Sequence, residues 1–290
     1  MHKLHLKANA KINLALAVKF RRSDGFHEIE SLFQEIEYGD DIIIEKANQI
    51  QFSTTSELIP DDNDNLCVRA ARLMQKNYPF PGAKIYLDKK IPIGAGLGGG
   101  SSDAAAVLCG LNRIYELNLD QQVLMNLAGQ LGSDVPFFIS GGAAYVTGRG
   151  EKIQPVQIDR QYLIVLIMPP LAVATAWAYK NLNLTLTKKL QGDKFIGFKF
   201  QDLTVSRFNS EYYNDFEHTV FAAYPELLAI KDALYQRGAV YAAMSGSGSA
   251  LFGLFADQES AGQAMKSFAN KYNCVLTKPV AKSRQFYLGA

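Results

Sequence analysis

The start of the chain alternates between apolar and polar side chains. Apolar residues occupy every even position from Leu4 to Val18, and polar residues fill the odd positions from Lys3 to Asn13. A period of two is typical of a β-strand. The polar set shares one face of that strand, so Lys11 and Asn13 point the same way, about 7 Å apart by the strand rise. Most lysines in such strands are solvated edge residues, and position alone favours that interpretation of Lys11.

A second strand follows a tight turn at residues 21–25 and begins near Phe26 and His27. These two side chains could bind a nucleobase, with the Phe26 ring stacking on it and His27 hydrogen-bonding to it, or they could be an ordinary pair at a strand end. The sequence leaves both interpretations open. Residues 41–46 and 83–89 predict further strands.

An acidic and amide-rich run over residues 61–65 resembles the opening of a calcium-binding loop. Leu66 and Arg72 stand where such a loop has Gly and Glu, which excludes an EF-hand. We therefore expect the run to cap a helix over residues 66–76.

The segment from Pro92 to Ala106 carries five glycines within positions 94–100. Glycine adopts positive φ and leaves its N–H group unshielded, so this loop can wrap an anion. Ser101, Ser102 and Asp103 are good helix caps ahead of an Ala-rich apolar stretch, which predicts a helix beginning where the glycines end. The N-terminal dipole and unpaired N–H groups of that helix suit phosphate.

The sequence disfavours three other interpretations of this loop. A dinucleotide-binding fold needs a second strand ending in an acid about 20 residues on, and residues 119–132 have helical periodicity instead. A Walker loop needs a lysine directly after its glycines, and none stands there. A flexible linker would not lead at once into a strong apolar helix.

The next predicted helix spans residues 120–131 and ends at Gly132. Asp134 follows, just before the apolar run 135–138. A carboxylate with apolar neighbours either is buried for a catalytic role or caps a loop, and capping is the commoner of the two. Residues 141–150 then predict a strand and a turn.

The second half of the chain predicts an α+β unit after a boundary near residues 155–160. Thr175 is expected to cap a helix, Asn214–Glu217 precedes another, and residues 185–205 carry no secure pattern. The other expected elements are strands over 162–168, 239–244, 250–255 and 274–280, helices over 226–237 and 258–272, and a flexible loop over 245–249.

Composition sets the outer bounds. The 290 residues are 48% hydrophobic and 20% charged with a net charge of +2, which suits a folded two-domain protein without a nucleic-acid surface. Cys67, Cys109 and Cys274 are widely spaced in apolar contexts and predict buried free thiols, not disulfides or a metal site. We find no signal-peptide pattern and no apolar run of about 18 residues, so we expect a cytoplasmic protein that does not contact membranes.

Taken together, several motifs resemble the GHMP kinase superfamily, named for galactokinase, homoserine kinase, mevalonate kinase and phosphomevalonate kinase. They are Ala10–Leu14 with Asp24–Glu28, Pro92–Ala106, Gly132–Phe138 and Met244–Ala250. The first and third resemble the members that act on a cytidine-diphosphate-linked methylerythritol in the non-mevalonate isoprenoid precursor pathway. Those members usually have Tyr where this chain has Phe26, so the ring is kept and a hydroxyl is lost.

The resemblance implies an α+β, two-domain GHMP kinase fold. Residues 1–157 would form a domain like the second domain of ribosomal protein S5, residues 158–290 a ferredoxin-like domain, and the active site would lie between them. The implied reaction transfers the γ-phosphate of ATP, with Mg²⁺, to the 2-hydroxyl of this small-molecule substrate, giving the 2-phosphate and ADP. Monomer and homodimer are both compatible with the sequence.

The resemblance also implies roles for residues. Asp134 would be the general base, and Lys11 would lie close to it, favour its ionised form and stabilise charge during transfer. Residues expected to hold ATP are Asn65, Pro92, Ile93, Gly94, Ala95, Gly96, Leu97, Gly98, Gly99, Gly100, Ser101 and Ser102, and Ser101 or Ser102 would bind magnesium. Residues expected on the substrate side are Asn13, Phe26, His27, Phe33, Thr175, Gly246 and Ser247, with Phe26 and His27 holding the cytosine.

Two alternative functions remain open on the sequence. The nearer is another kinase of the superfamily acting on mevalonate or homoserine, and the pair Phe26–His27 argues against it because that pair suits a base. The more distant is a non-catalytic RNA-binding protein built on the ribosomal-like domain. It predicts a basic stripe, which the near-neutral charge disfavours.

Overall fold

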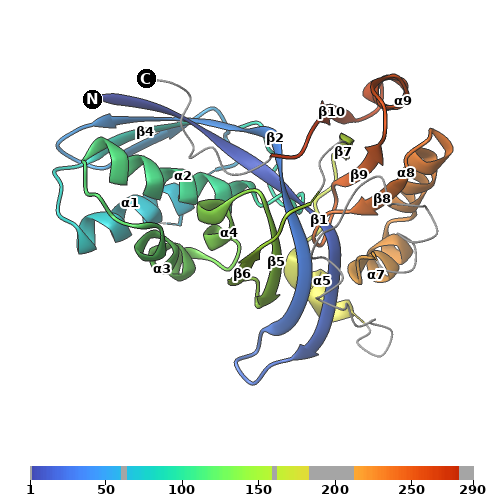
Figure 1. Ribbon diagram of the computed structural model, residues 1–290, viewed down its shortest axis with the longest axis horizontal. Coiled ribbons are helices and arrows are strands. Elements are labelled where there is room, and N and C mark those ends of the chain that lie inside the picture. The colour runs from blue at the N-terminus through green and yellow to red at the C-terminus, as the bar shows by residue number, and fades with distance from the viewer. Residues whose placement is uncertain (1, 60–63, 159–161, 183–211, 281–290) are drawn as a thin grey trace.

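The computed structural model describes residues 2–59, 64–158, 162–182 and 212–280. Helices α1 to α4 gather in one half of the molecule, and the C-terminal strands and helices form the other half (Figure 1). The long hairpin of β1 (Lys3–Arg21) and β2 (His27–Lys46) runs between the halves. The unpatterned segment 185–205 lies outside the described residues.

The N-terminal half is built on a sheet in which β2 is central. The strand order is β3-β4-β2-β5-β6, and β1 pairs with β2 off this path. The strand expected over residues 41–46 is the end of β2 and not a separate element. The remaining strands are β4 (Ala83–Asp88), β5 (Ala143–Gly148), and two that were not predicted from the sequence, β3 (Gln51–Thr54) and β6 (Lys152–Pro155).

Four helices complete this half: the first, second and fourth contact its sheet, and the third packs on the other three helices. They are α1 (Leu66–Asn77), α2 (Gly99–Ile114), α3 (Gln121–Leu131) and α4 (Val135–Ser140). Asn65 caps α1 through Oδ1, which accepts hydrogen bonds from the N–H groups of Cys67 and Val68. The cap expected for α2 is wrong, because this helix begins two residues earlier, at Gly99, with Gly98 at its N-cap and no side-chain cap.

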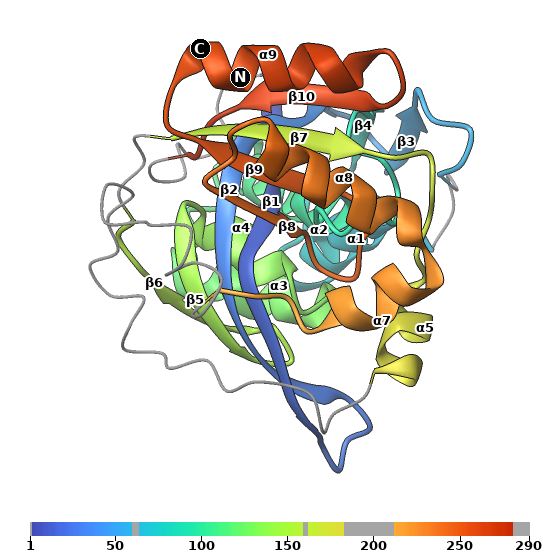
Figure 2. The ribbon, with the colours of Figure 1, turned by 90° about the vertical axis from the view of Figure 1, so that its right-hand side faces the viewer.

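The C-terminal half is a four-stranded antiparallel sheet with strand order β10-β7-β9-β8. Numbered within this half, the order is 4-1-3-2, as in ferredoxin-like folds, and the expected fold class is confirmed. Its strands are β7 (Leu163–Met168), β8 (Tyr241–Met244), β9 (Leu251–Phe255) and β10 (Asn273–Thr277), and its helices are α5 (Thr175–Asn181), α7 (Phe216–Ala223), α8 (Pro225–Gln236) and α9 (Gln258–Ala269). In Figure 2, α8 lies in front of the strands of this sheet and α9 runs above β10 at the top of the view.

Strand β7 is buried on both faces, which explains its unbroken apolar sequence. Val165 and Ile167 pack in one hydrophobic cluster with residues of α8 and α9. Ile164 and Leu166 pack in another cluster, which contains Ala10, Ile12 and Leu14 of β1. The two halves therefore share a continuous core, and the boundary at residue 157 stays a prediction.

Strand β1 packs against different elements along its length. Leu4, Leu6 and Ala8 belong to the cluster that includes the helices of the N-terminal half, whereas the next even residues pack on the second sheet. A register shift between Asn9 and Ala10 accompanies the change. Such irregularities re-aim side chains, and here Lys11 turns toward the start of α2.

The described residues contain no helix long and apolar enough to cross a membrane. All three cysteines are free. Cys67 and Cys109 are buried as expected, and Cys274 is only half-buried.

Candidate active site

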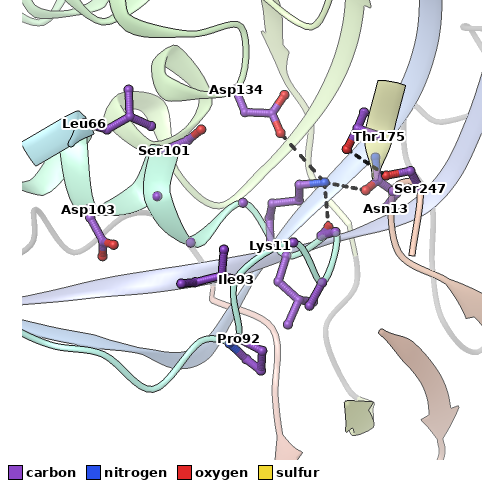
Figure 3. A pocket seen from close by; sticks show the side chains of 18 of the residues that line it. Lys11, Asn13, Leu66, Pro92, Ile93, Ser101, Asp103, Asp134, Thr175 and Ser247 are labelled. Atoms are coloured by element: carbon purple, nitrogen blue, oxygen red, sulfur yellow. Dashed lines mark hydrogen bonds and ion pairs between the residues drawn. The ribbon is translucent and has the colours of Figure 1, made fainter. Parts of the chain in front are cut away.

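A pocket of about 550 Å³ lies between the two halves of the molecule. Its lining comes from the centre of β1, the glycine loop before α2, the start of α4, α5 and the loop 245–249. In Figure 3 the Lys11 side chain extends into the middle of this pocket, with Asp134 on one side and Thr175 and Ser247 on another.

Lys11 and Asp134 meet in this pocket. The distance from Lys11 Nζ to Asp134 Oδ2 is 3.9 Å, although the two residues lie far apart in the sequence. Lys11 is only 3% exposed, so the solvated-edge interpretation is wrong. Its ammonium donates hydrogen bonds to Asn13 Oδ1 at 2.5 Å and to the Gly96 carbonyl at 3.0 Å. Burial lowers the pKa of Lys11, and the charge of Asp134 opposes that shift.

The carboxylate of Asp134 is not used as a helix cap. The residue stands at the N-cap position of α4, yet its side chain makes no capping hydrogen bond, so the commoner interpretation from the sequence is wrong. Its side chain is 32% exposed and lines the pocket. A carboxylate with this access can accept a proton from a bound hydroxyl group.

The glycine loop turns its backbone toward the same pocket. Gly94, Gly96 and Gly98 have φ values of +70°, +77° and +70°, which side-chain-bearing residues rarely adopt. A β-carbon on Gly98 would lie 2.9 Å from the Phe138 ring and 3.2 Å from Lys11 Cγ. Because no side chain caps α2, its first N–H groups remain available at the pocket, where the helix dipole favours an anion.

A buried ionic cluster lies under the start of α2, and the sequence analysis missed it. Lys89 Nζ contacts Asp40 Oδ2 at 2.5 Å and Asp103 Oδ2 at 2.7 Å. Burial raises the pKa of Asp103 to about 8, Lys89 opposes this, and the neighbouring Asp40 reinforces it. Asp103 is therefore part of the support of α2 and not its cap.

One end of the pocket has an apolar lining. Leu58, Ile59, Leu66 and Ile93 border it, together with Asn65. Leu58 is 82% exposed and stands at the mouth. A flat base fits such a surface.

The opposite end of the pocket is aromatic. The His27 and Tyr179 rings stack with centroids 4.7 Å apart, and Phe216 meets Tyr179 edge-on at 4.8 Å. Phe26 is 52% exposed, and the guanidinium carbon of Arg149 lies 4.8 Å from its ring centroid. Sequence reasoning missed Tyr179 and Arg149 because their aromatic partners, His27 and Phe26, lie far away in the sequence.

Thr175 and Ser247 also meet in the pocket, from α5 and the loop 245–249. Their hydroxyl oxygens are 3.0 Å apart. Thr175 is the first residue of α5 and not its cap, because Ala174 holds the N-cap position.

The structure brings most of the expected site residues together. Three of them do not line the pocket: Ser102 is fully buried, and Phe26 and His27 lie beside the aromatic end. Those that line it are Lys11, Asn13, Phe33, Asn65, Pro92, Ile93, Gly94, Ala95, Gly96, Leu97, Gly98, Gly99, Gly100, Ser101, Asp134, Thr175, Gly246 and Ser247.

Comparison with known proteins shows the family to which the chain belongs. Residues 65–142 match the GHMP kinases N terminal domain, and residues 203–274 match the GHMP kinases C terminal domain. The chain is 41% identical over 278 residues to the 4-diphosphocytidyl-2-C-methyl-D-erythritol kinase of Chlorobium chlorochromatii, covering 94% of this chain and 96% of that one.

Solved structures agree with this assignment. A crystal structure of 4-(cytidine 5'-diphospho)-2C-methyl-D-erythritol kinase matches with a TM-score of 0.76 and 32% identity, covering 95% of this chain and 98% of the other. The homoserine kinase of Cytophaga hutchinsonii matches with a TM-score of 0.71, covering 98% of this chain and 96% of the other. At 18% identity, this second match shows the fold alone.

Proposed function

The chain belongs to the GHMP kinases and, within them, to the family of 4-diphosphocytidyl-2-C-methyl-D-erythritol kinases, and on this premise we propose how its residues act. The substrate is 4-diphosphocytidyl-2-C-methyl-D-erythritol, and the reaction serves isoprenoid precursor synthesis. ATP supplies the phosphoryl group, which passes to the 2-hydroxyl of the substrate. The products are ADP and the 2-phosphate.

The start of α2 suits the phosphates of ATP. Its uncapped N–H groups and the positive φ of Gly94, Gly96 and Gly98 leave a backbone cradle that needs no side chain. The apolar lining at Leu66 and Ile93 suits the adenine ring.

Magnesium would enter with ATP, and its charge would neutralise part of the phosphate charge. No cluster of three acidic, histidine or cysteine side chains suited to a metal occurs among the described residues. This fits an ion held mainly by phosphates and water, with one or two protein ligands. Ser101 lines the pocket whereas Ser102 is fully buried, so we assign the protein ligand to Ser101.

The acceptor would lie between Asp134 and the aromatic end of the pocket. Its 2-hydroxyl oxygen attacks the γ-phosphorus, and Asp134 takes the hydroxyl proton. The bond from the γ-phosphorus to the β,γ-bridging oxygen breaks, and ADP leaves with the electron pair. Lys11, whose ammonium lies 3.9 Å from Asp134 Oδ2, stabilises negative charge on the attacking oxygen or the moving phosphoryl group.

The aromatic end of the pocket suits the cytosine base of the substrate. His27 offers a ring and hydrogen-bonding nitrogens, and Tyr179 stacks on it. Phe26 with Arg149 above it extends this surface outward, where the guanidinium can meet an anionic diphosphate. Homoserine and mevalonate carry no nucleobase that could stack on these rings.

The observation that carries the proposal is the approach of Lys11 Nζ to Asp134 Oδ2 beside the uncapped end of α2. The test is Asp134→Asn, which keeps the volume and removes the base. We expect kcat for ADP release to fall by about 10²- to 10⁴-fold with an unchanged unfolding midpoint.

The matched control is Asp120→Asn, because Asp120 also precedes a helix but lies outside the pocket lining. It should turn over like the parent. Parent-like turnover by Asp134→Asn would refute the base assignment. Competition among the diphosphocytidyl substrate, mevalonate and homoserine at equal concentration tests the acceptor, and preference for either small acid would refute it.

A further inference from the structure

The segment Asn214–Glu217 lies at the acceptor end of the pocket, where Phe216 is part of the aromatic lining. It enters α7, which lies beside α5 in both ribbon views (Figures 1 and 2). Each of its four side chains makes a specific contact with another element. These contacts reach Met244 at the end of β8, directly before the loop 245–249, and also β1 and α5.

Asn214 makes the most specific of these contacts. Its side chain is buried, with the residue 4% exposed. Nδ2 donates to the Met244 carbonyl at 2.8 Å and to the Gly246 carbonyl at 2.7 Å, while Oδ1 accepts from the Phe216 N–H at 3.0 Å. Only a side chain with two donors and one acceptor satisfies all three groups.

The neighbouring acidic residues hold the same region from other sides. Glu217 Oε1 accepts from the Met244 N–H at 2.8 Å, so both backbone groups of Met244 are fixed from this segment. Asp215 Oδ2 accepts from the Val18 N–H at 2.7 Å, and the Asp215 N–H donates to the Leu16 carbonyl at 2.9 Å. The loop 245–249 is thereby tied to β1, the strand that carries Lys11.

Two walls of the acceptor end depend on this arrangement. Gly246, held through its carbonyl, leads into Ser247, whose hydroxyl meets Thr175. Phe216, held through its N–H, places its ring against Tyr179, which stacks on His27. One amide therefore sets both the serine side and the aromatic side of the pocket.

We infer that Asn214 is a positioning residue for the acceptor, and that it acts through Gly246 and Phe216 without touching the substrate. The inference rests on the proposed function, because it names the side of the pocket where the acceptor binds. The glycine loop that would hold ATP receives no bond from Asn214. Ser245, in the loop that Asn214 holds, also contacts Gly96 of the glycine loop, so loss of the Asn214 amide should weaken acceptor binding more strongly than nucleotide binding.

The test uses two substitutions in the full-length protein. Asn214→Asp is isosteric and places a carboxylate oxygen against two carbonyl oxygens. Asn214→Ser replaces the two amide N–H donors with one shorter hydroxyl group, adds no charge and keeps an oxygen for the Phe216 N–H. It therefore serves as a second test if the first variant does not fold. In each, kcat and KM are measured for the acceptor, and Kd for a non-hydrolysable ATP analogue is measured by calorimetry.

We expect kcat/KM for the acceptor to fall by about 10- to 100-fold in both variants, since misplacement by about 1 Å costs this much. Kd for the ATP analogue should change by less than about two-fold. The matched control is Asn112→Asp, because Asn112 also holds a backbone segment through its amide, at Leu119, away from the pocket. Its kinetics should equal those of the parent.

A purely structural role would lower the unfolding midpoint and leave the acceptor constants unchanged, and this result would overturn the inference. Equal losses for acceptor and ATP analogue would also overturn it. In both cases the parent still phosphorylates the diphosphocytidyl substrate, so the proposed function stands. A parent that does not turn over this substrate refutes the proposed function, and this inference falls with it.

Discussion

The contact between the two glycine-rich loops can be tested with a pair of alanine substitutions. Gly96 and Gly94 lie in the same loop with nearly equal φ values of +77° and +70°. A β-carbon on Gly96 would lie 2.0 Å from the Ser245 carbonyl oxygen, whereas one on Gly94 meets no atom within 4 Å. The two substitutions therefore share the backbone strain and differ only in the loop contact.

The magnitudes follow from this geometry. An alanine in the left-handed region costs about 1–2 kcal/mol, and both variants should lose that much stability. Gly96→Ala must also move the two loops apart by roughly 1 Å, which adds about 1–3 kcal/mol of overpacking. Because the Gly96 carbonyl accepts from Lys11 Nζ and from Ser245 Oγ, the shift should reach the ammonium.

The assays are urea unfolding and steady-state ADP release. Gly96→Ala should lose about 2–5 kcal/mol of unfolding free energy and about 100-fold in kcat/KM. Gly94→Ala should lose about 1–2 kcal/mol and less than ten-fold in kcat/KM. Equal stability and equal activity of the two variants would refute the idea that the loops touch at Gly96 and that this contact places Lys11.

Two further predictions concern buried charges. Lys11→Met should lower kcat by about 10²-fold or more. The unfolding free energy should stay the same or rise by about 1 kcal/mol, because burial lowers the pKa of Lys11 and disfavours its charge. A marked loss of stability in urea unfolding would contradict this prediction. Burial raises the pKa of Asp103 to about 8, so the folded state binds the extra proton and stability should fall as pH rises from about 4 to 8. Asp103→Asn should flatten that slope in urea unfolding series across this range, and an unchanged slope would contradict the assignment.

Local patterns in the sequence predicted most elements of this fold. The period-two start, the glycine loop followed by a helix, and the alternation of strands and helices in the second half are all present, whereas the ferredoxin-like arrangement of that half was implied by the family resemblance. Each of these signals depends on neighbouring residues, which is why a sequence carries it. Strand β3 has only four residues and gave no such signal. Strand β2 was predicted as two separate strands, because Gly39, Asp40 and Asp41 interrupt its pattern of apolar residues.

Capping was predicted less well, for a physical reason. Ser101 and Thr175 have good capping side chains, but α2 begins at Gly99 and the N-cap of α5 is Ala174. At the pocket, an uncapped helix start leaves N–H groups for a ligand. Propensity describes the stability of a helix alone, and it fails where the same groups serve binding.

The meeting of Lys11 with Asp134 could be expected only through the family resemblance. Taken alone, Lys11 read as a solvated lysine and Asp134 as a cap, and both interpretations were wrong. Tyr179, Arg149 and Asn214 were missed because their partners are distant in sequence. Contacts of this kind depend on how the two sheets dock, which no local pattern encodes.

The burial of Lys11 itself follows from how β1 is shared between the two halves. The strand first packs on the helices of its own half and then, past the shift at Asn9, on the second sheet. Lys11 lies at the transition between these two packing partners, so its side chain is covered both by the N-terminal half and by the second sheet. The Gly96 carbonyl completes its cover and also binds Ser245 of the second half. The ammonium is thus desolvated by the docking of the two halves, and its ion pair with Asp134 lies inside the pocket that we propose for phosphoryl transfer.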